Sequence, residues 1–392
     1  MSSPFAKLAD RRRHLDVDNP LRSLTDVINA VPNGLNLGQG ICDLDTPTPL
    51  VEGAVASISE GTDRQVYTNY SGLPELRSQI AAKLRKFNGL DYEENQVMVA
   101  TGSSGAQYAA LLTLVEPGEE VILFEPFYSY HYSAVKLLGA VPVCVPLQGF
   151  DFDPDRLRAA ITPRTRALIL NSPGNPSGKV FGMEDLEAVA EVLDGTNIVV
   201  LTDEVYEYMC FDGRVHISPA TVPGLSDRAL TIGSFSKTFS ITGWRIGYLA
   251  GPTDLVEMVG RVFDQIDICA PRPLQRGVAR ALEQLPDSFY SEMQSEYQVK
   301  RDRFCGALEK AGFGFTAPQG AYYVLADYTD VLGDLEPYPA VLSMIERAGI
   351  NAVPGNLFFA NQEGVRTVRF QFAVKMDLID EACRRLPGLA SG

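Results

Sequence analysis

The chain has 392 residues, with 49 acidic and 34 basic side chains and a formal net charge of −15. A chain of this length buries a large core and is expected to divide into about two domains. The acidic balance argues against a nucleic-acid partner, which would need a basic surface. No stretch approaches the roughly 18 apolar residues of a membrane span, and the first residues lack the apolar segment of a signal peptide. We therefore expect a cytoplasmic protein with no membrane partner.

The cysteines and histidines are scattered along the sequence, and no two cysteines form a Cys-x-x-Cys pair. This spacing fits the reduced thiols of a cytoplasmic protein and supports neither a disulfide framework nor a zinc site. The isolated histidines provide no scaffold for a serine–histidine triad, so the sequence predicts no metal and no such triad. The residues concerned are Cys42, Cys144, Cys210, Cys269, Cys305, Cys383, His14, His131 and His216.

Residues 1–44 are predicted to form an N-terminal arm that contributes to a small domain. A helix is expected from Pro20 to Ala30, where a Pro-Asn-Gly stretch ends it. The extended segment 35–40 ends in glycines, at which a backbone can approach a ligand closely. After an exposed loop, Pro74 opens a helix that runs to about Phe87.

Residues 97–270 alternate between short apolar runs and amphipathic stretches. Short strands between helices are typical of a mainly parallel sheet with helices on both faces. We assign this region to a large domain, residues 45–285. The expected strands are 97–100, 121–124, 141–145, 167–170, 198–201 and 230–232, and the expected helices are 104–115, 129–138, 153–160 and 183–193.

After this region the pattern changes to longer helices and fewer strands, which predicts a smaller α+β domain at residues 286–392. The fold class is therefore α/β, with a mainly parallel sheet sandwiched by helices plus a smaller α+β domain. In the smaller domain, helices are expected at 286–311, at 339–348 and up to about residue 385, with strands near 321–325 and 365–372.

Lys237 is the first candidate for chemistry. It is expected on a loop at the end of an apolar strand, among hydroxyl side chains and with no carboxylate within several positions. Surface lysines normally lie on charged helix faces instead. A crowded, partly desolvated ammonium loses its proton more easily and becomes a nucleophile, so Lys237 is a candidate to form a Schiff base.

Polar groups also follow the other expected strands, and ligands of open α/β sheets bind outside the carboxyl ends of the strands. The turn 101–105 leads into a helix whose N-terminus suits a phosphate. Tyr128 follows the second strand, and an Asn- and Pro-rich turn at 171–178 follows the fourth. Asp203 and Tyr206 follow the fifth strand, where a carboxylate suits a cationic ring nitrogen. The polar groups of five strand ends thus predict one common site.

Together these motifs resemble the class I/II aminotransferases, the fold-type I family that depends on pyridoxal phosphate (PLP), over nearly the whole chain. The most specific matches are Ser-x-Ser-Lys-x5-Gly-x-Arg-x-Gly at 234–247, Asn-Ser-Pro-x-Asn-Pro-Ser-Gly at 171–178 and Asp-Glu-x-Tyr at 203–206. The segments 37–40, 125–128, 318–323 and 368–372 look closest to the kynurenine, glutamine and methionine aminotransferases. The resemblance implies the PLP-dependent transferase fold type I.

The resemblance also implies a role for each matched residue. Lys237 would hold PLP as the internal aldimine and then move the proton from Cα to C4′. Asp203 would pair with the pyridinium nitrogen, which keeps the ring able to accept carbanion charge. Tyr206 and Asn175 would hydrogen-bond the phenolic oxygen, and Tyr128 would stack on the ring. The expected cofactor contacts around the phosphate are Ser103, Ser104, Gly105, Ser234 and Arg245.

Further matched residues concern the substrate and a second subunit. Arg369 would bind the substrate α-carboxylate as a bidentate fork, a geometry that lysine cannot copy. Gly38 and Asn175 would complete that pocket. Tyr67 would reach the phosphate in the neighbouring subunit, which implies a homodimer with shared active sites. The implied substrates are an L-amino acid and a 2-oxo acid.

The chain departs from the family pattern at several positions. Gly174 stands where relatives often have His or Asn, and Ile41-Cys42-Asp43 replaces an aromatic residue and a proline. We interpret Cys42 and Asp43 as loop residues without a catalytic role. Arg272 lies where relatives line the partner's pocket, and it either binds an acidic substrate or caps a helix, of which we favour the cap.

Three functional hypotheses apply to a sequence with these motifs. The leading hypothesis is a PLP-dependent aminotransferase. A PLP-dependent lyase, eliminating at Cβ or Cγ as in carbon–sulfur lyases or cyclopropane-forming relatives, would use Lys237, Asp203 and Arg369 in the same way. A transcription regulator with an aminotransferase-like domain would need an N-terminal DNA-binding extension, and the arm before residue 35 is too short for one.

Overall fold

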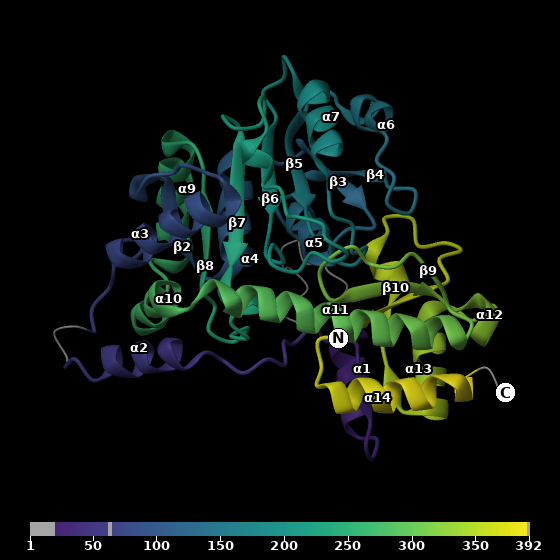
Figure 1. Cartoon of the computed structure of the whole chain (residues 1–392). Coiled ribbons are helices and arrows are strands. Elements are labelled where there is room, and N and C mark those ends of the chain that lie inside the picture. Colours follow the sequence, from purple (N-terminus) through teal and green to yellow (C-terminus); the bar gives the residue numbers. More distant parts are fainter. Residues whose placement is uncertain (1–19, 62–64, 390–392) are drawn as a thin grey trace, which may run out of the picture.

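A seven-stranded sheet forms the centre of the larger part of the molecule (Figure 1). The computed structural model describes residues 20–61 and 65–389, so the rest of the expected arm, residues 1–19, lies outside the described residues. Strands β4, β3, β5, β6 and β7 are parallel, whereas β8 runs antiparallel to both β7 and β2, which confirms a mainly parallel sheet. In spatial order the strands are β2 (Val97–Ala100), β8 (Gly247–Ala250), β7 (Ala229–Ser234), β6 (Val199–Asp203), β5 (Thr165–Asn171), β3 (Glu120–Glu125) and β4 (Val141–Pro146).

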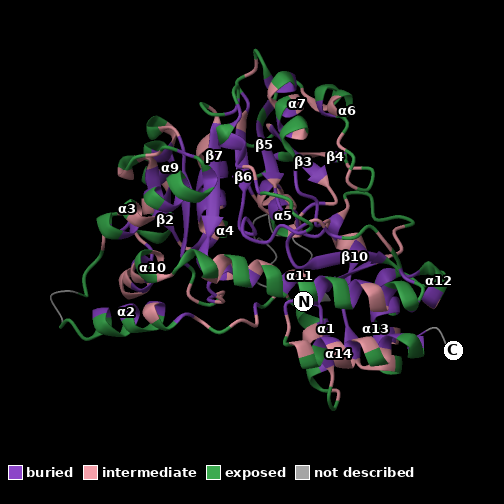
Figure 2. Cartoon of the chain, viewed as in Figure 1, coloured by how far each residue is buried: buried purple, intermediate pink, exposed green. Residues whose placement is uncertain are grey.

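Helices cover both faces of this sheet. In β5, Ala167 and Ile169 pack with residues of α4, α5 and α9, whereas Leu168 and Leu170 pack with α6 and α7. Successive side chains of a strand point to opposite faces, so a sheet covered on both faces needs the near-continuous apolar runs found here. Figure 2 shows these strands as buried and the outer helix faces as exposed. The helices are α3 (Pro74–Lys83), α4 (Gly102–Leu114), α5 (Ser129–Leu137), α6 (Pro154–Ala160), α7 (Met183–Leu193), α9 (Thr253–Asp267) and α10 (Arg272–Gln284).

A four-stranded antiparallel sheet forms the centre of the smaller part, and α11 extends from the α10 side of the large sheet towards it (Figure 1). The parallel pair β1–β11 joins residues 35–36 to the C-terminal region. We retain the domain limits at residues 44 and 285 as a proposal. The strands are β12 (Val353–Pro354), β13 (Thr367–Gln371), β10 (Tyr323–Asp327), β9 (Gly314–Phe315), β1 (Leu35–Asn36) and β11 (Ile350–Asn351), and the helices are α1 (Pro20–Asn29), α11 (Asp287–Lys310), α12 (Thr329–Leu332), α13 (Pro337–Ala348) and α14 (Met376–Arg385).

Several elements differ from the expectation. Helix α2 (Thr48–Ile58) was not predicted, because its apolar side chains do not lie on one face: Leu50 and Ala54 are buried, whereas Val51, Val55 and Ile58 are exposed. Strand β8 was interpreted only as part of the Arg245 motif. Lys237 lies in the single-turn helix α8 (Phe235–Thr238) and not on a loop. The helix that Pro74 opens ends in a π-turn, Leu84–Asn88.

Short 3-10 turns complete the described structure. They span Glu94–Gln96, Pro219–Thr221, Gly355–Phe358 and Leu386–Leu389. Within the described ranges, no helix combines the length and the apolar character needed to cross a bilayer.

Candidate active site

A cavity of about 350 Å³ lies at the carboxyl edge of the large sheet, and residues from both parts of the molecule line it. Because β2, β3, β5, β6 and β7 point the same way, the turns after their carboxyl ends meet at this edge. Most of the residues expected from the sequence to form the site therefore come together. Those in the lining are Ser103, Ser104, Tyr128, Asn175, Asp203, Tyr206, Ser234, Lys237, Arg245 and Arg369.

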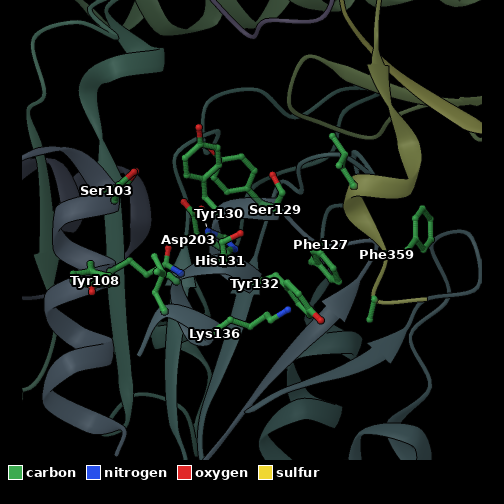
Figure 3. A pocket seen from close by; sticks show the side chains of 18 of the residues that line it. Ser103, Tyr108, Phe127, Ser129, Tyr130, His131, Tyr132, Lys136, Asp203 and Phe359 are labelled. Carbon is green, nitrogen blue, oxygen red and sulfur yellow. Dashed lines mark ion pairs between the residues drawn. The ribbon is translucent and has the colours of Figure 1, made fainter. Parts of the chain in front are cut away.

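Three expected residues lie outside that lining. Gly105 lines an adjacent cavity of about 650 Å³, which shares Ser103 and Asp203 with the first (Figure 3). Gly38 contributes a backbone carbonyl that accepts a hydrogen bond from Arg369. Tyr67 belongs to neither lining, and it is 77% exposed on the protein surface.

Lys237 lies in the short helix α8, which places its side chain in the lining of the cavity. Ser234, the last residue of β7, caps this helix by accepting a hydrogen bond from the amide of Ser236. The Lys237 Nζ donates to the carbonyl of Gly40 at 3.1 Å and lies 5.6 Å from the ring centroid of Tyr322. No carboxylate of the described residues forms an ion pair with this amine, so it is directed at the cavity without a counter-charge.

Asp203 is fixed by His131, which is isolated in the sequence. The Nε2 of His131 lies 2.9 Å from Oδ2 of Asp203, and both side chains are buried (Figure 3). His131 also meets the ring of Tyr128 edge-on, with the centroids 5.1 Å apart. Tyr128 is the N-cap residue of α5 and His131 lies in the first turn of that helix, so their closeness in the sequence was the available signal. His131 thereby sets the orientation of the Asp203 carboxylate.

Tyr206 is paired with Tyr323, another residue for which no role had been predicted. Their hydroxyl oxygens lie 3.2 Å apart. Burial raises the pKa of Tyr206 well above its usual value, and the neighbouring Tyr323 adds to this effect, so Tyr206 stays a hydrogen-bond donor. A side chain at Gly40 would place its Cβ only 2.0 Å from the Tyr323 hydroxyl oxygen. A glycine at position 40 therefore allows Tyr323 to reach the site.

Arg369 on β13 is a buried cation without a carboxylate partner among the described residues. Its guanidinium donates to Oδ1 of Asn175 and to the carbonyl of Gly38, both at 2.9 Å. The guanidinium carbon lies 4.3 Å from the ring centroid of Tyr323 and 5.1 Å from that of Phe358. Its Nε is buried and has no hydrogen-bond partner. An uncompensated buried charge is costly, so this geometry calls for an anionic ligand.

The first turn of α4 and the segment before β8 form a cradle that fits the expected phosphate. A Cβ at Gly102 would lie 2.4 Å from Nη2 of Arg245. At Gly247, a Cβ would lie 2.6 Å from the carbonyl carbon of Gly102 and 2.7 Å from the amide nitrogen of Ser103. The two glycines thus let the guanidinium and the N-terminus of α4 approach one point, where amides, hydroxyls and a cation suit a phosphate group.

The residues that depart from the family pattern are tied to the scaffold. The Asp43 carboxylate forms an ion pair with the buried Lys300 at 2.6 Å. The Cys42 thiol donates to the carbonyl of Lys237 at 3.5 Å, and burial raises its pKa. Arg272 is the first residue of α10, whose N-cap residue is Pro271, so Arg272 does not cap this helix. Its Nε is buried without a partner, and the acidic-substrate alternative stays open.

Comparison with known proteins agrees with this geometry. Residues 32–386 match the family model "Aminotransferase class I and II". The chain is 38% identical over 370 residues to a probable N-succinyldiaminopimelate aminotransferase of Mycobacterium tuberculosis, covering 91% of this chain and 92% of that protein. It is 33% identical to an aromatic-amino-acid aminotransferase of Thermococcus litoralis, covering 97% of each. The solved structure of N-succinyldiaminopimelate aminotransferase from Mycobacterium tuberculosis superposes with a TM-score of 0.91 at 36% identity, covering 98% of this chain and 100% of that one.

The chain belongs to the class I and II aminotransferase family. It has the fold type I architecture of that family, and it is a PLP-dependent aminotransferase that takes an amino acid and a 2-oxo acid as substrates. The predicted family, fold class, cofactor and enzyme class are confirmed. The lyase alternative is not favoured, because the related proteins are named aminotransferases.

The phosphate cradle makes a prediction about two glycines of one segment. Gly247→Ala pushes the Gly102–Ser103 turn away from Arg245, so we expect the affinity for PLP to fall by at least about tenfold, or about 1.4 kcal/mol. Gly243→Ala is the matched control, because a Cβ there meets no atom within 4 Å. Titration of the apoprotein with PLP, followed by absorbance, measures both affinities. Equal affinity for PLP in the two variants would show that the cradle does not bind the phosphate.

Proposed function

We propose that Lys237 holds PLP covalently through its amine and that the same amine moves the proton at the substrate Cα. The observation that carries this proposal is the presence of two cations without carboxylate partners, Lys237 and Arg369, in one cavity. When bound, PLP supplies a sink for the electron pair left at Cα. The role of the protein is to place that carbon within reach of Lys237 Nζ and to hold the reacting groups in fixed positions.

Each proposed cofactor contact has a physical reason. The Asp203 carboxylate, oriented by His131, stabilises a protonated ring nitrogen. The Tyr206 hydroxyl, kept protonated by burial, donates to the phenolic oxygen alongside Asn175. Tyr128 packs against the face of the ring. The phosphate is bound in the cradle by Ser103, Ser104, Gly105, Ser234 and Arg245.

Arg369 is proposed to bind the α-carboxylate of both substrates. Its guanidinium is already oriented by Asn175 and Gly38, so two parallel hydrogen bonds to a carboxylate require little reorganisation. This contact directs the Cα of the substrate towards Lys237. Because an amino acid and its 2-oxo acid share the carboxylate, one cation serves both halves of the exchange.

The protein is also proposed to be a homodimer whose active sites are shared. Large apolar side chains are exposed around α2 and the loop that follows it, among them Val55, Ile58, Val66 and Tyr67. Helix α2 lies at the edge of the molecule beside α10 (Figure 1), so its outer face is free to be covered by a second copy. In that arrangement Tyr67 reaches the phosphate bound in the partner. Location in the cytoplasm, with no nucleic-acid partner, stays a prediction from the sequence.

The first test removes the proposed nucleophile. Lys237→Ala is expected to keep the circular dichroism of the wild-type protein but to lose the visible absorbance that PLP gives when it is bound to the wild type, since no amine remains at that position. Borohydride reduction followed by peptide mass analysis locates the labelled lysine. In the wild type, amino-group transfer should require a 2-oxo acid.

Two outcomes would contradict this part of the proposal. A visible absorbance band that persists in Lys237→Ala would show that another lysine carries the cofactor. Release of ammonia and a 2-oxo acid from an amino acid, without any added 2-oxo acid, would overturn the assignment of Lys237 to transfer and favour elimination.

The second test concerns the substrate carboxylate. Arg369→Lys keeps the charge but loses the bidentate fork, so we expect amino-acid affinity to fall by about 10- to 100-fold while PLP stays bound. The conversion of the cofactor spectrum by an amino acid measures this affinity. Arg366→Lys is the matched control, because Arg366 pairs with Asp334 and Glu336 outside the cavity. An unchanged amino-acid affinity in Arg369→Lys would show that Arg369 does not bind the substrate carboxylate.

The third test asks whether Tyr67 acts across the dimer. Lys237→Ala and Tyr67→Ala subunits are expected to be defective alone, but in a hybrid dimer one site regains both Lys237 and the partner's Tyr67. Co-expression with two affinity tags isolates this hybrid, which should recover about half of the wild-type activity at limiting PLP because one of its two sites is intact. No recovery would show that Tyr67 does not serve the neighbouring site.

A further inference from the structure

A buried polar network lies behind the turn that carries Asp203 and Tyr206. It includes two carboxylates, Glu204 and Glu207, which are 0% and 4% exposed and are absent from the lining of the active-site cavity. The family motif explained only the first and last residues of the stretch 203–206. The remaining members of the network come from separate elements: Lys83, Asn88, Thr202, His216, Ser218 and Tyr248.

Glu207 is bound by two side chains of the α3 region. The Lys83 ammonium donates to its Oε2 at 2.5 Å, and Nδ2 of Asn88 donates to the same oxygen at 2.9 Å. The ammonium also donates to Oδ1 of Asn88 at 2.9 Å and to the Tyr248 hydroxyl at 3.0 Å. Three hydrogen bonds saturate the donors of Lys83.

Glu204 is bound mainly by the chain that follows the turn. Its Oε2 accepts from the Ser218 hydroxyl and lies 2.7 Å from Nε2 of His216, while Oε1 accepts from Thr202 at 2.6 Å. Burial alone would raise the pKa of Glu204, but the bonds from His216 and the hydroxyls outweigh it, so the pKa lies below its usual value. Glu204 is thus held as a carboxylate.

The three groups Glu204, Glu207 and His216 lie close enough to resemble a metal site. We do not assign a metal to them. The Lys83 ammonium already binds the Glu207 carboxylate, and the hydroxyls of Thr202 and Ser218 already donate to the Glu204 carboxylate. Protein donors therefore take the place that a metal ion would need.

The side chains of the turn alternate between the active-site cavity and the buried network. Asp203 and Tyr206 line the cavity, whereas Glu204 and Glu207, each one residue later, face the network. Residues 204–208 belong to neither a helix nor a strand. The backbone of this stretch is held by turn hydrogen bonds, from the Glu204 amide to the carbonyl of Ile232 at 2.9 Å and from the Glu207 amide to the carbonyl of Glu204 at 3.0 Å. The side chains of Glu204 and Glu207 add bonds from this turn to separate elements of the fold.

We propose that Glu204 and Glu207 are positioning residues: the buried network anchors the turn 203–207 so that Asp203 and Tyr206 present their oxygen atoms to the cofactor. The inference rests on the proposed cofactor roles of those two residues. Glu204 and Glu207 then contribute to the reaction indirectly, because they hold Asp203 and Tyr206 in place. Asn88, which donates to both carboxylates, links the two halves of the network.

The test follows the pH midpoint of the visible absorbance of the holoenzyme. Displacement of the Tyr206 hydroxyl leaves the phenolic oxygen with one donor fewer, so this oxygen holds the neighbouring proton more tightly and the midpoint rises. We expect Glu207→Ala to raise it by about one pH unit, a tenfold change in proton affinity, and to lower kcat by at least about tenfold with little change in KM for the amino acid. Glu207→Gln, whose amide oxygen can still accept from Lys83 and Asn88, should restore the midpoint.

The matched control is Glu120→Ala. Glu120 is also a buried carboxylate bound by hydroxyls and a cation, but it begins β3 at the opposite end of the sheet from the cavity. Its loss should lower the thermal midpoint of unfolding without moving the absorbance midpoint. Should Glu207→Ala fail to fold, Asn88→Ala keeps both charges of the ion pair and is expected to shift the absorbance midpoint in the same direction by a smaller amount.

Tyr206→Phe separates failure of this inference from failure of the proposed function. If Tyr206→Phe raises the midpoint but neither Glu207→Ala nor Asn88→Ala does, the network only stabilises the fold and the inference is wrong. An unchanged midpoint in Tyr206→Phe itself would show that Tyr206 does not contact the cofactor, and both the proposed role of Tyr206 and the inference would then be overturned.

Discussion

The active site depends on the direction of the strands in the large sheet. Parallel strands end at a common edge, so polar turns that are far apart in the sequence face one cavity. The antiparallel strand β8 begins at this edge instead of ending there. Its first residue, Gly247, pairs with Ser234 at the end of β7 and with Ala100 at the end of β2. Arg245, just before β8, therefore reaches the edge at which the other strands end. A fully parallel sheet would have placed that guanidinium elsewhere.

Charge pairing distinguishes the site from the rest of the interior. Elsewhere, buried cations such as Lys83 and Lys300 meet carboxylates at 2.5–2.6 Å. Lys237 and Arg369 instead bond to neutral oxygens, and no carboxylate pairs with either among the described residues. Since an unpaired buried charge is costly, the guanidinium of Arg369, which is 3% exposed, favours an anionic ligand that relieves this cost. A carboxylate is a group of that kind.

The sequence allowed much of this site to be predicted, because its motifs are local. Lys237, Asp203 and Arg369 each follow or lie in a strand whose apolar pattern is clear, and the structure places them around one cavity. His131 and Tyr323 were not predicted as site residues, because their contacts depend on the packing of separate elements. The approach of Tyr323, for example, requires the absence of a side chain at Gly40.

The elements that were missed have a similar cause. Helix α2 packs its small face against α10, where a Cβ at Gly53 would lie 3.0 Å from the Cα of Gly277. Close packing of this kind gives no amphipathic pattern, and the exposed valines on the other face obscure it further. Strand β8 has only four residues, next to a motif with a stronger chemical interpretation. Tertiary contacts, and not local preference, define both elements.

The turn after β6 shows how one short stretch satisfies opposite demands. Asp203 is the last residue of β6, so the turn that follows lies beyond the hydrogen-bonded ladder of the sheet. The side chains of this stretch divide between two sides: Asp203 and Tyr206 line the cavity, whereas Glu204 and Glu207 accept hydrogen bonds from protein side chains on the other side. Burying those carboxylates gains little stability by itself, since desolvation offsets most of the attraction. A cost of this kind at a turn that bears two proposed cofactor contacts is better explained by geometric precision than by stability alone.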